Sequence, residues 1–427
     1  TRQLKIKRIF VADDLKDKPS GLAVLNRLSD LPVLISALPK INDLLAGRLD
    51  RSDIQEVGIS DLLGRSVVPP KKELMRAAVK SRNILITGAA GTIGSELCDT
   101  ILVHEPHTLI LLDHSEIALY NLQKQLEKKS RNRSKIIFLL GSIMDQEYIE
   151  SVISKFQIAK VYHAAAYKHV HLVEENIISG VRNNVLGTMN LVNAIRRSPV
   201  EELVLISSDK AVHPKNVMGA TKRLAEMIVL NFAARESGKI FSLVRFGNVM
   251  RSSGSVIPLF EDQIRNGGPV TVTDGRATRY FMTSLEASQL VIQASAMASG
   301  GEIFVLDMGY PIRIETLAKK MIHLHGKSYV GEYEESDREN EIEIRYTGLR
   351  AGEKLNEKLF ASEEFIKTSH PRIFVSSEKD VKIFEIESVC RSLEKACNAS
   401  DHKAIKSIVE GCIEGFEFDN ISLDPRW

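Results

Sequence analysis

Three side chains that can exchange protons stand side by side in this sequence: Ser208, Asp209 and Lys210. They follow the apolar run at 203–206 after one intervening residue, Ser207, and such a run is typical of a short buried strand. A carboxyl group and an amine next to each other can act as the acid and the base of one reaction. The pattern therefore suggests proton-transfer chemistry at the end of a strand. The alternative is that these residues are simply the polar, solvent-facing end of that strand.

Short apolar runs alternate with helical patterns over the middle of the chain. Strands are expected at 84–86, 109–112, 136–140, 161–163, 203–206 and 240–244. Helices are expected near 92–103, 116–129, 145–156, 179–197 and 218–236. This alternation is typical of a parallel sheet covered on both faces, so we expect an α/β fold with a doubly wound, Rossmann-type sheet. In such a sheet ligands bind outside the carboxyl ends of the strands.

The pattern divides the chain into three regions. Residues 1–80 form an N-terminal extension that ends in a Pro-Pro-Lys-Lys stretch typical of a linker. Residues 81–248 are expected to form a dinucleotide-binding domain, to which a strand near 301–307 returns. Residues 249–427 are expected to supply mainly a smaller substrate-binding domain and C-terminal helices.

Composition and charge exclude several classes of protein. The chain has 427 residues, of which 44% are hydrophobic and 26% charged, a balance typical of a globular protein. Its net charge of +2 lacks the basic bias of most nucleic-acid-binding proteins, so we expect no nucleic-acid partner. The four cysteines lack a metal-type spacing, which indicates reduced thiols in the cytosol and no metal site.

A glycine-rich turn follows the first expected strand of the sheet. Gly88, Gly91 and Gly94 allow a tight turn and a close approach of the backbone to a pyrophosphate. Thr92 and Ile93 begin the next helix, whose positive N-terminal end can bind phosphate. Because the spacing departs from the usual G-x-G-x-x-G pattern, a purely structural turn is the alternative.

Residues at two further strand ends fit the same cofactor. Asp113 ends the second strand, about 20 residues after the glycine turn, where a carboxylate binds the ribose of NAD. The same carboxylate would repel the extra phosphate of NADP, so we expect NAD, although Asp113 could instead cap a helix. His163, Ala164 and Ala165 end the fourth strand, and the small residues leave room for the cofactor. His163 could equally be a core histidine.

Several motifs together resemble one protein family. They are the turn at 88–94, Ser-Ser-Asp-Lys-Ala-Val at 207–212, Asn-Val-Met-Gly-Ala-Thr-Lys at 216–222, and Gly-Leu-Arg-Ala-Gly-Glu-Lys-Leu at 348–355. Over about residues 45–375 the chain resembles the membrane-anchored bacterial UDP-N-acetylglucosamine 4,6-dehydratases. These are nucleotide-sugar epimerase/dehydratase enzymes of the extended short-chain dehydrogenase/reductase superfamily. The motif at 61–65 extends the resemblance upstream.

The resemblance implies a lyase that removes water from UDP-N-acetylglucosamine, for the synthesis of surface polysaccharide or glycan. In this reaction NAD takes a hydride from C4 of the sugar and returns it at C6, so the product is a UDP-4-keto-6-deoxy sugar. The resemblance also implies membrane helices upstream in a longer protein of the inner membrane, with this soluble portion on the cytoplasmic side. A homo-oligomer is expected.

Roles for the strand-end residues follow from the resemblance. Asp209 is expected to protonate the departing C6 hydroxyl, and Lys210 to remove the C5 proton as a neutral amine. Burial or a nearby positive charge such as Lys222 would favour that neutral form. Lys222 is also expected to hold the nicotinamide ribose. Met218 replaces the superfamily's usual tyrosine, a feature of this subgroup, so the base for C4 oxidation stays open between Ser208 as a relay and Asp209 itself.

Substrate contacts are implied for a further set of residues. They are Lys168, Asn184, Asn248, Ser255, Arg279, Arg350 and Glu353. The arginines suit a diphosphate because a guanidinium can bind phosphate with two hydrogen bonds.

Two other functions remain open. A UDP-hexose or UDP-hexosamine 4-epimerase would use the same scaffold, but it needs no acid–base pair for elimination. A non-catalytic module that binds NAD or a nucleotide sugar would make Met218 a sign of lost activity. The presence of Asp209, Lys210 and Lys222 together favours the dehydratase.

Overall fold

The computed structural model describes residues 6–12, 19–38, 55–59, 61, 68–129, 134–331, 340–350, 352–359, 364–378 and 385–418. Apart from Asp61, the motif at 61–65 lies outside them. The chain forms two compact units. The first comprises Thr1–Val68, Asn248–Thr283 and Met308–Arg350; the second comprises Pro69–Gly247, Ser284–Asp307 and Ala351–Trp427. The three-region division expected from the sequence stays a prediction.

The second unit contains the large sheet. In spatial order its strands are β18 (Phe365–Lys367), β19 (Ile373–Ser376), β14 (Ile303–Leu306), β9 (Ile240–Arg245), β8 (Glu202–Ile206), β7 (Lys160–His163), β4 (Asn83–Thr87), β5 (Thr108–Asp113) and β6 (Lys135–Leu140). The strands from β14 to β6 are all parallel, and β19 and β18 add an antiparallel edge. The expected doubly wound parallel sheet is confirmed.

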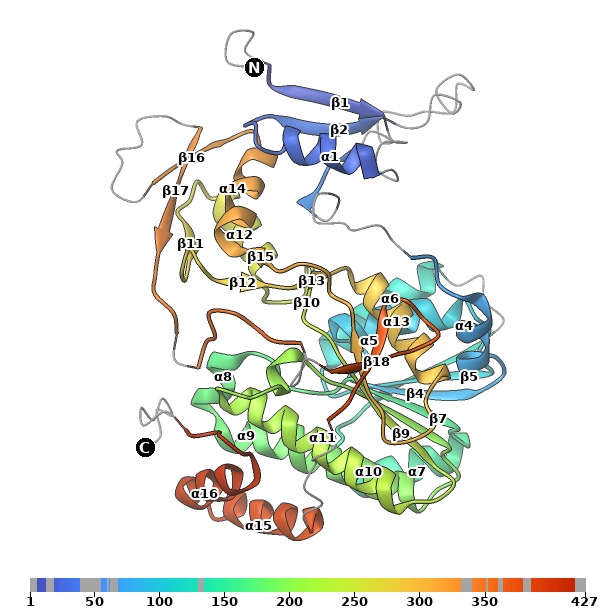
Figure 1. Cartoon of the computed structure of the whole chain (residues 1–427). Coiled ribbons are helices and arrows are strands. Elements are labelled where there is room, and N and C mark those ends of the chain that lie inside the picture. Colours follow the sequence, from blue (N-terminus) through green and yellow to red (C-terminus); the bar gives the residue numbers. More distant parts are fainter. Residues whose placement is uncertain are drawn as a thin grey trace. The chain divides into compact units, whose positions relative to one another are not determined.

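Helices cover both faces of this sheet. Figure 1 shows α4 (Lys72–Val79), α5 (Thr92–Leu102), α6 (Glu116–Lys129) and α13 (Ser284–Ala296) on one side, and α7 (Gln146–Phe156), α10 (Gly187–Arg196) and α11 (Val217–Arg235) on the other. Because both faces are covered, the central strands are largely apolar; Ile84, Leu85 and Ile86 of β4 are fully buried. The chain reverses direction across the sheet between β4 and β7, so the crevice outside these strand ends is where such folds bind ligands.

The remaining helices of the second unit extend its α10 and α11 side. The expected helix at 179–197 is divided into α9 (Ile177–Val181), a π-helical turn (Arg182–Leu186) and α10. It is preceded by α8 (Val170–Glu175). The C-terminal helices α15 (Ile386–Asn398) and α16 (His402–Cys412) contact each other and α9, and they bury apolar side chains that include Leu393 and Val409.

The first unit is built from smaller sheets. Its N-terminal part has β1 (Arg8–Ala12) parallel to β2 (Leu34–Leu38), with β3 (Gln55–Glu56) antiparallel at the edge and α1 (Pro19–Leu28) between β1 and β2. Its other strands are β10 (Asn248–Val249), β11 (Val270–Val272), β12 (Thr278–Arg279), β13 (Phe281–Met282), β15 (Ile312–Arg313), β16 (Ser328–Val330) and β17 (Glu341–Tyr346). Two helices, α12 (Val256–Arg265) and α14 (Ile314–Leu324), pack on β11. Among the residues described in either unit, no helix is long and apolar enough to span a membrane.

Candidate active site

The glycine turn between β4 and α5 lies against the end of β7. Gly88 has a left-handed φ of +67°, and a Cβ atom there would lie 2.6 Å from Cα of Ala165. At Gly94 a Cβ would collide with the carbonyl oxygen of Gly88. The backbone therefore packs too closely for any side chain, and Gly91 offers the start of α5 no capping side chain. This geometry suits a helix N-terminus that receives a phosphate, with Thr92 at its first position.

Asp113 connects this turn to the end of β5. Its Oδ2 accepts a 2.9 Å hydrogen bond from the backbone N–H of Ala90, and its Oδ1 accepts one of 2.9 Å from Ser115. The helix-capping role belongs instead to Ser115, whose hydroxyl accepts from the N–H of Ala118. Asp113 is thus a buried carboxylate fixed beside the glycine turn, and its oxygens retain lone pairs for a sugar hydroxyl.

His163 is a buried core histidine with both ring nitrogens engaged. Nδ1 lies 2.7 Å from Oγ1 of Thr87, and Nε2 lies 3.0 Å from Oγ1 of Thr188. The Thr188 hydroxyl donates its proton to the carbonyl of Asn184, so Nε2 of His163 must be the donor in their contact. Burial, assisted by the charge of Lys222, lowers the pKa of His163 to about 3. The ring is therefore neutral and fixes the end of β7 without moving protons.

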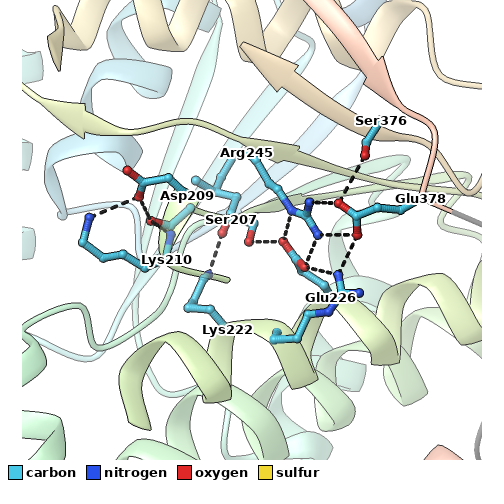
Figure 2. Close-up of polar contacts among 11 residues, drawn as sticks. Ser207, Asp209, Lys210, Lys222, Glu226, Arg245, Ser376 and Glu378 are labelled. Carbon is cyan, nitrogen blue, oxygen red and sulfur yellow. Dashed lines mark hydrogen bonds and ion pairs between the residues drawn. The ribbon is translucent and has the colours of Figure 1, made fainter. Parts of the chain in front are cut away.

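The three proton-exchanging residues share one oxygen atom. Asp209 begins a 3₁₀ turn (Asp209–Ala211) directly after β8, and its Oδ1 accepts hydrogen bonds from Oγ of Ser208 at 2.8 Å and from Nζ of Lys210 at 3.1 Å. Figure 2 shows the contact between Asp209 and Lys210 at the strand end. Asp209 is 1% exposed, and its Oδ2 makes no hydrogen bond to any described residue. The expected acid and base are therefore directly paired.

The N-terminus of α11 packs directly on this turn. A Cβ at Gly219 would lie 2.5 Å from the carbonyl oxygen of Lys210, and Asn216 caps the helix by accepting from the N–H of Gly219. Met218 and Lys222 are both buried on this helix. Nζ of Lys222 donates a 2.6 Å hydrogen bond to the carbonyl of Ile206 in β8, and burial lowers the pKa of Lys222 to about 8.

A buried ion-pair cluster lies near the same strand end, to the right of Asp209 and Lys210 in Figure 2. It consists of Ser207, Arg223, Glu226, Arg245 and Glu378. Arg245 at the end of β9 binds both oxygens of Glu226 at 2.7 Å and also binds Glu378, which follows β19. Arg223 bridges the same two carboxylates at 3.0 and 3.1 Å. The pKa of Glu226 falls to about 2, because the two guanidinium groups and the Ser207 hydroxyl outweigh its burial.

Three of the expected substrate contacts belong to the second unit. Asn184 lies in the π-helical turn, where its amide nitrogen donates to the carbonyl of Tyr167 and the hydroxyl of Thr221, and its oxygen accepts from the Tyr167 N–H. It therefore connects the loop after β7 to α11 in this structure. Lys168 is exposed on that same loop, and Glu353 is half-buried.

The other four expected contacts belong to the first unit. Asn248 begins β10, where its N–H donates to the carbonyl of Tyr280. Ser255 precedes α12, Arg279 is buried on β12, and Arg350 is exposed. Their part in nucleotide binding stays a prediction.

Sequence reasoning missed several charged residues near the strand end. Glu357 lies 3.8 Å from Nζ of Lys210, and Arg245, Glu226 and Glu378 form the buried ion-pair cluster. Two signals were available. Arg245 directly follows the expected strand at 240–244, and Glu357 stands three residues after Lys354 of the 348–355 motif.

The fold places the protein in the Rossmann-type class, and comparison with known proteins gives its family. The family described as polysaccharide biosynthesis protein matches residues 84–378. The chain belongs to this family, which confirms the resemblance to nucleotide-sugar dehydratases and epimerases.

Several curated relatives are similar to most of the chain. The capsular polysaccharide biosynthesis protein CapD of Staphylococcus aureus is 43% identical over 373 residues, which are 87% of this chain and 60% of CapD. The probable polysaccharide biosynthesis protein EpsC of Bacillus subtilis is 43% identical, covering 82% of this chain and 56% of EpsC. The chain thus spans less than two thirds of these two relatives. A UDP-glucose 4-epimerase of Rickettsia rickettsii is 31% identical over 71% of this chain and 89% of its own length.

Solved structures share the fold. Pen from Bacillus thuringiensis is 35% identical, with a TM-score of 0.62 over 70% of this chain and 90% of Pen. The dTDP-glucose 4,6-dehydratase DesIV from Streptomyces venezuelae, solved with NAD and TYD bound, has a TM-score of 0.56 at 20% identity. It covers 65% of this chain and 88% of DesIV.

Proposed function

We propose that this protein catalyses the NAD-dependent 4,6-dehydration of UDP-N-acetylglucosamine to a UDP-4-keto-6-deoxy sugar, for the synthesis of surface polysaccharide or glycan. The observation that carries the proposal is the hydrogen-bonded triad of Ser208, Asp209 and Lys210 at the end of β8. Elimination of water needs an acid and a base side by side, and this strand end supplies both.

The residues around the glycine turn fit NAD. The close packing of Gly88 on Ala165 clears space for a dinucleotide backbone, and the fixed Asp113 carboxylate suits the two hydroxyls of an unphosphorylated ribose. When bound, NAD would take a hydride from C4 of the sugar and return it at C6. Lys222, held by the carbonyl of Ile206, would contribute a hydrogen bond to the nicotinamide ribose and a positive charge.

The triad accounts for the protons without a tyrosine. As C4 is oxidised, its hydroxyl proton passes to Ser208, whose own proton moves along the 2.8 Å hydrogen bond to Asp209. Protonated Asp209 then gives this proton to the C6 hydroxyl, which leaves as water. The O4 proton therefore departs with the product water, and Met218 needs no part in the transfer.

Lys210 handles the C5 proton separately. It removes this proton as a neutral amine and returns a proton to C5 once C6 has been reduced. The ion pair with Asp209 holds the ammonium form, so Lys210 must first release a proton. Its side chain is 20% exposed, which gives that proton a way to solvent.

A 4-epimerase is the second candidate, favoured by the similarity to the UDP-glucose 4-epimerase of Rickettsia rickettsii. An epimerase returns the hydride to C4 and has no use for a base at C5. Lys210 donates a hydrogen bond to Oδ1 of Asp209, the same oxygen that accepts from Ser208. A base for C5 is thus present beside the proton relay, which favours the dehydratase.

Incubation with NAD and UDP-N-acetylglucosamine in heavy water tests the proposal. We expect a product that has lost one water and carries deuterium at C5, detected by mass spectrometry and proton NMR. A product of unchanged mass with an inverted C4 would establish the epimerase instead. No reaction, with NAD bound, would indicate a binding module.

The setting of the whole protein is also a proposal, since the chain spans only part of CapD and EpsC. By resemblance, we propose a membrane-anchored homo-oligomer whose catalytic region faces the cytoplasm.

A further inference from the structure

The segment at 352–359 is anchored to the catalytic turn and to the start of α11. The amide of Asn216 donates a 2.9 Å hydrogen bond to the carbonyl of Gly352, and Nζ of Lys354 donates one of 2.9 Å to the carbonyl of Val212. Gly352 has a φ of +72°, and a Cβ there would lie 2.7 Å from Cβ of Asn216. These contacts fix where the rest of the segment lies.

Glu357 is the carboxylate that this anchoring brings to Lys210. Its side chain is 4% exposed, and its Oε1 lies 3.8 Å from Nζ of Lys210. Its Oε2 lies 3.6 Å from Nζ of Lys354 and makes no hydrogen bond to any residue that the structure describes. A buried carboxylate oxygen without a hydrogen bond is costly, so its presence beside a reactive lysine calls for an explanation.

Four charged side chains lie close enough here to influence one another electrostatically. Asp209 and Lys210 face each other on the 3₁₀ turn, and Glu357 and Lys354 face them from the 352–359 segment. Burial lowers the pKa of Lys354, while the charges of Glu357 and Asp209 oppose this fall and that of Lys210 adds to it. Positive and negative charges thus alternate from Asp209 through Lys210 and Glu357 to Lys354.

We propose that Glu357 is a positioning residue that acts through Lys210. Its carboxylate stabilises the ammonium group that forms when Lys210 removes the C5 proton. This inference rests on the proposed dehydration. In that reaction Asp209 is protonated just before elimination, because it has taken up the O4 proton. At that moment Glu357 is the remaining carboxylate partner of Lys210 among the ion pairs of the described residues. Stabilising charge where it develops in a buried site lowers the barrier.

A pH profile of kcat tests the inference. Activity rises with pH as Lys210 loses its proton, so removal of a neighbouring negative charge moves this rise to lower pH, and removal of a positive charge moves it to higher pH. We expect Glu357→Gln to shift the rise downward by roughly one pH unit and to lower the plateau by about 10- to 100-fold. Lys354→Gln should shift the rise upward. Lys358→Gln, which changes an exposed residue of the same segment, should match the wild type.

The two failures can be told apart. If wild-type protein forms no dehydrated product, the proposed function is wrong and the role of Glu357 is wrong with it. If wild-type protein is active but both Glu357→Gln and Lys354→Gln keep the wild-type pH profile, only the role of Glu357 is overturned. Deuterium uptake at C5 gives a second readout, which Glu357→Gln should slow more than formation of NADH in a single turnover. Equal slowing of both steps would indicate a merely structural residue.

Discussion

The hydroxyl of Ser208 donates a 2.8 Å hydrogen bond to Oδ1 of Asp209, the same oxygen that accepts from Nζ of Lys210. One carboxylate oxygen thus connects a hydroxyl that can relay a proton to an amine that can receive one. The other oxygen, Oδ2, is buried and makes no hydrogen bond to the described residues. This arrangement explains how oxidation and elimination could both proceed where Met218 occupies the position of a tyrosine.

Removal of the Ser208 hydroxyl should slow the first step. We expect Ser208→Ala to lower the rate of C4 oxidation by about 100-fold, since relay of a proton typically contributes a factor of this size or more. Single-turnover absorbance of NADH measures this step. Ser208→Thr keeps the hydroxyl and should retain most of the rate. An oxidation rate in Ser208→Ala equal to that of the wild type would exclude the relay.

The glycine turn should not tolerate even a methyl group. In Gly88→Ala the new Cβ would meet Ala165 at 2.6 Å in addition to the strain of a positive φ, and we expect a loss of about 3 kcal/mol or more with loss of NAD binding. Gly238→Ala is a matched control, because Gly238 has a φ of +89° and no atom within 4 Å of an added Cβ. It should cost only about 1 kcal/mol in urea unfolding. Equal losses in the two variants would contradict the packing argument.

Loss of Arg245 should strongly destabilise the fold. Arg245→Met leaves the buried carboxylates of Glu226 and Glu378 with Arg223 as their shared guanidinium, and breaking such a pair costs about 3–5 kcal/mol. Urea unfolding measures the loss. Lys124→Met removes an exposed ion pair with Glu127 and should leave stability close to that of the wild type. An Arg245→Met variant as stable as this control would show that the buried cluster is not needed for the fold.

The buried Lys222 should reduce stability at neutral pH. Its pKa is lowered from 10.5 to about 8 in the folded protein, so between these values the unfolded chain binds more protons and stability rises with pH. We therefore expect Lys222→Met to be inactive yet more stable at pH 7 by up to about 3 kcal/mol. This advantage should shrink as the pH rises from 8 to 10.5, as urea unfolding across that range would record. A constant difference would show that the charge of Lys222 is not the cause.

The sequence predicted the features that depend on local pattern. Apolar runs such as 84–86 and 109–112 indicate buried strands because period and length are local properties, and Gly88 and Asp113 were identified by their places after two of these strands. Glu357 and Glu378 were not identified, because they reach Lys210 and Arg245 only through the folded chain. The position of Glu357 three residues after Lys354 is a local signal, but it does not identify Lys210 as a partner. The hydrogen bonds of Asn184 to Tyr167 and Thr221 could not be read from the sequence, and its expected contact with substrate stays a prediction.

The most direct test of the central claim follows the hydride. UDP-N-acetylglucosamine that carries deuterium at C4 is incubated with the protein and NAD in ordinary water, and the product is read by NMR and mass spectrometry. A dehydratase moves the label within one molecule, so we predict a 4-keto product with deuterium in the C6 methyl group. Deuterium that remains at C4 of an inverted sugar would contradict the dehydration and identify an epimerase.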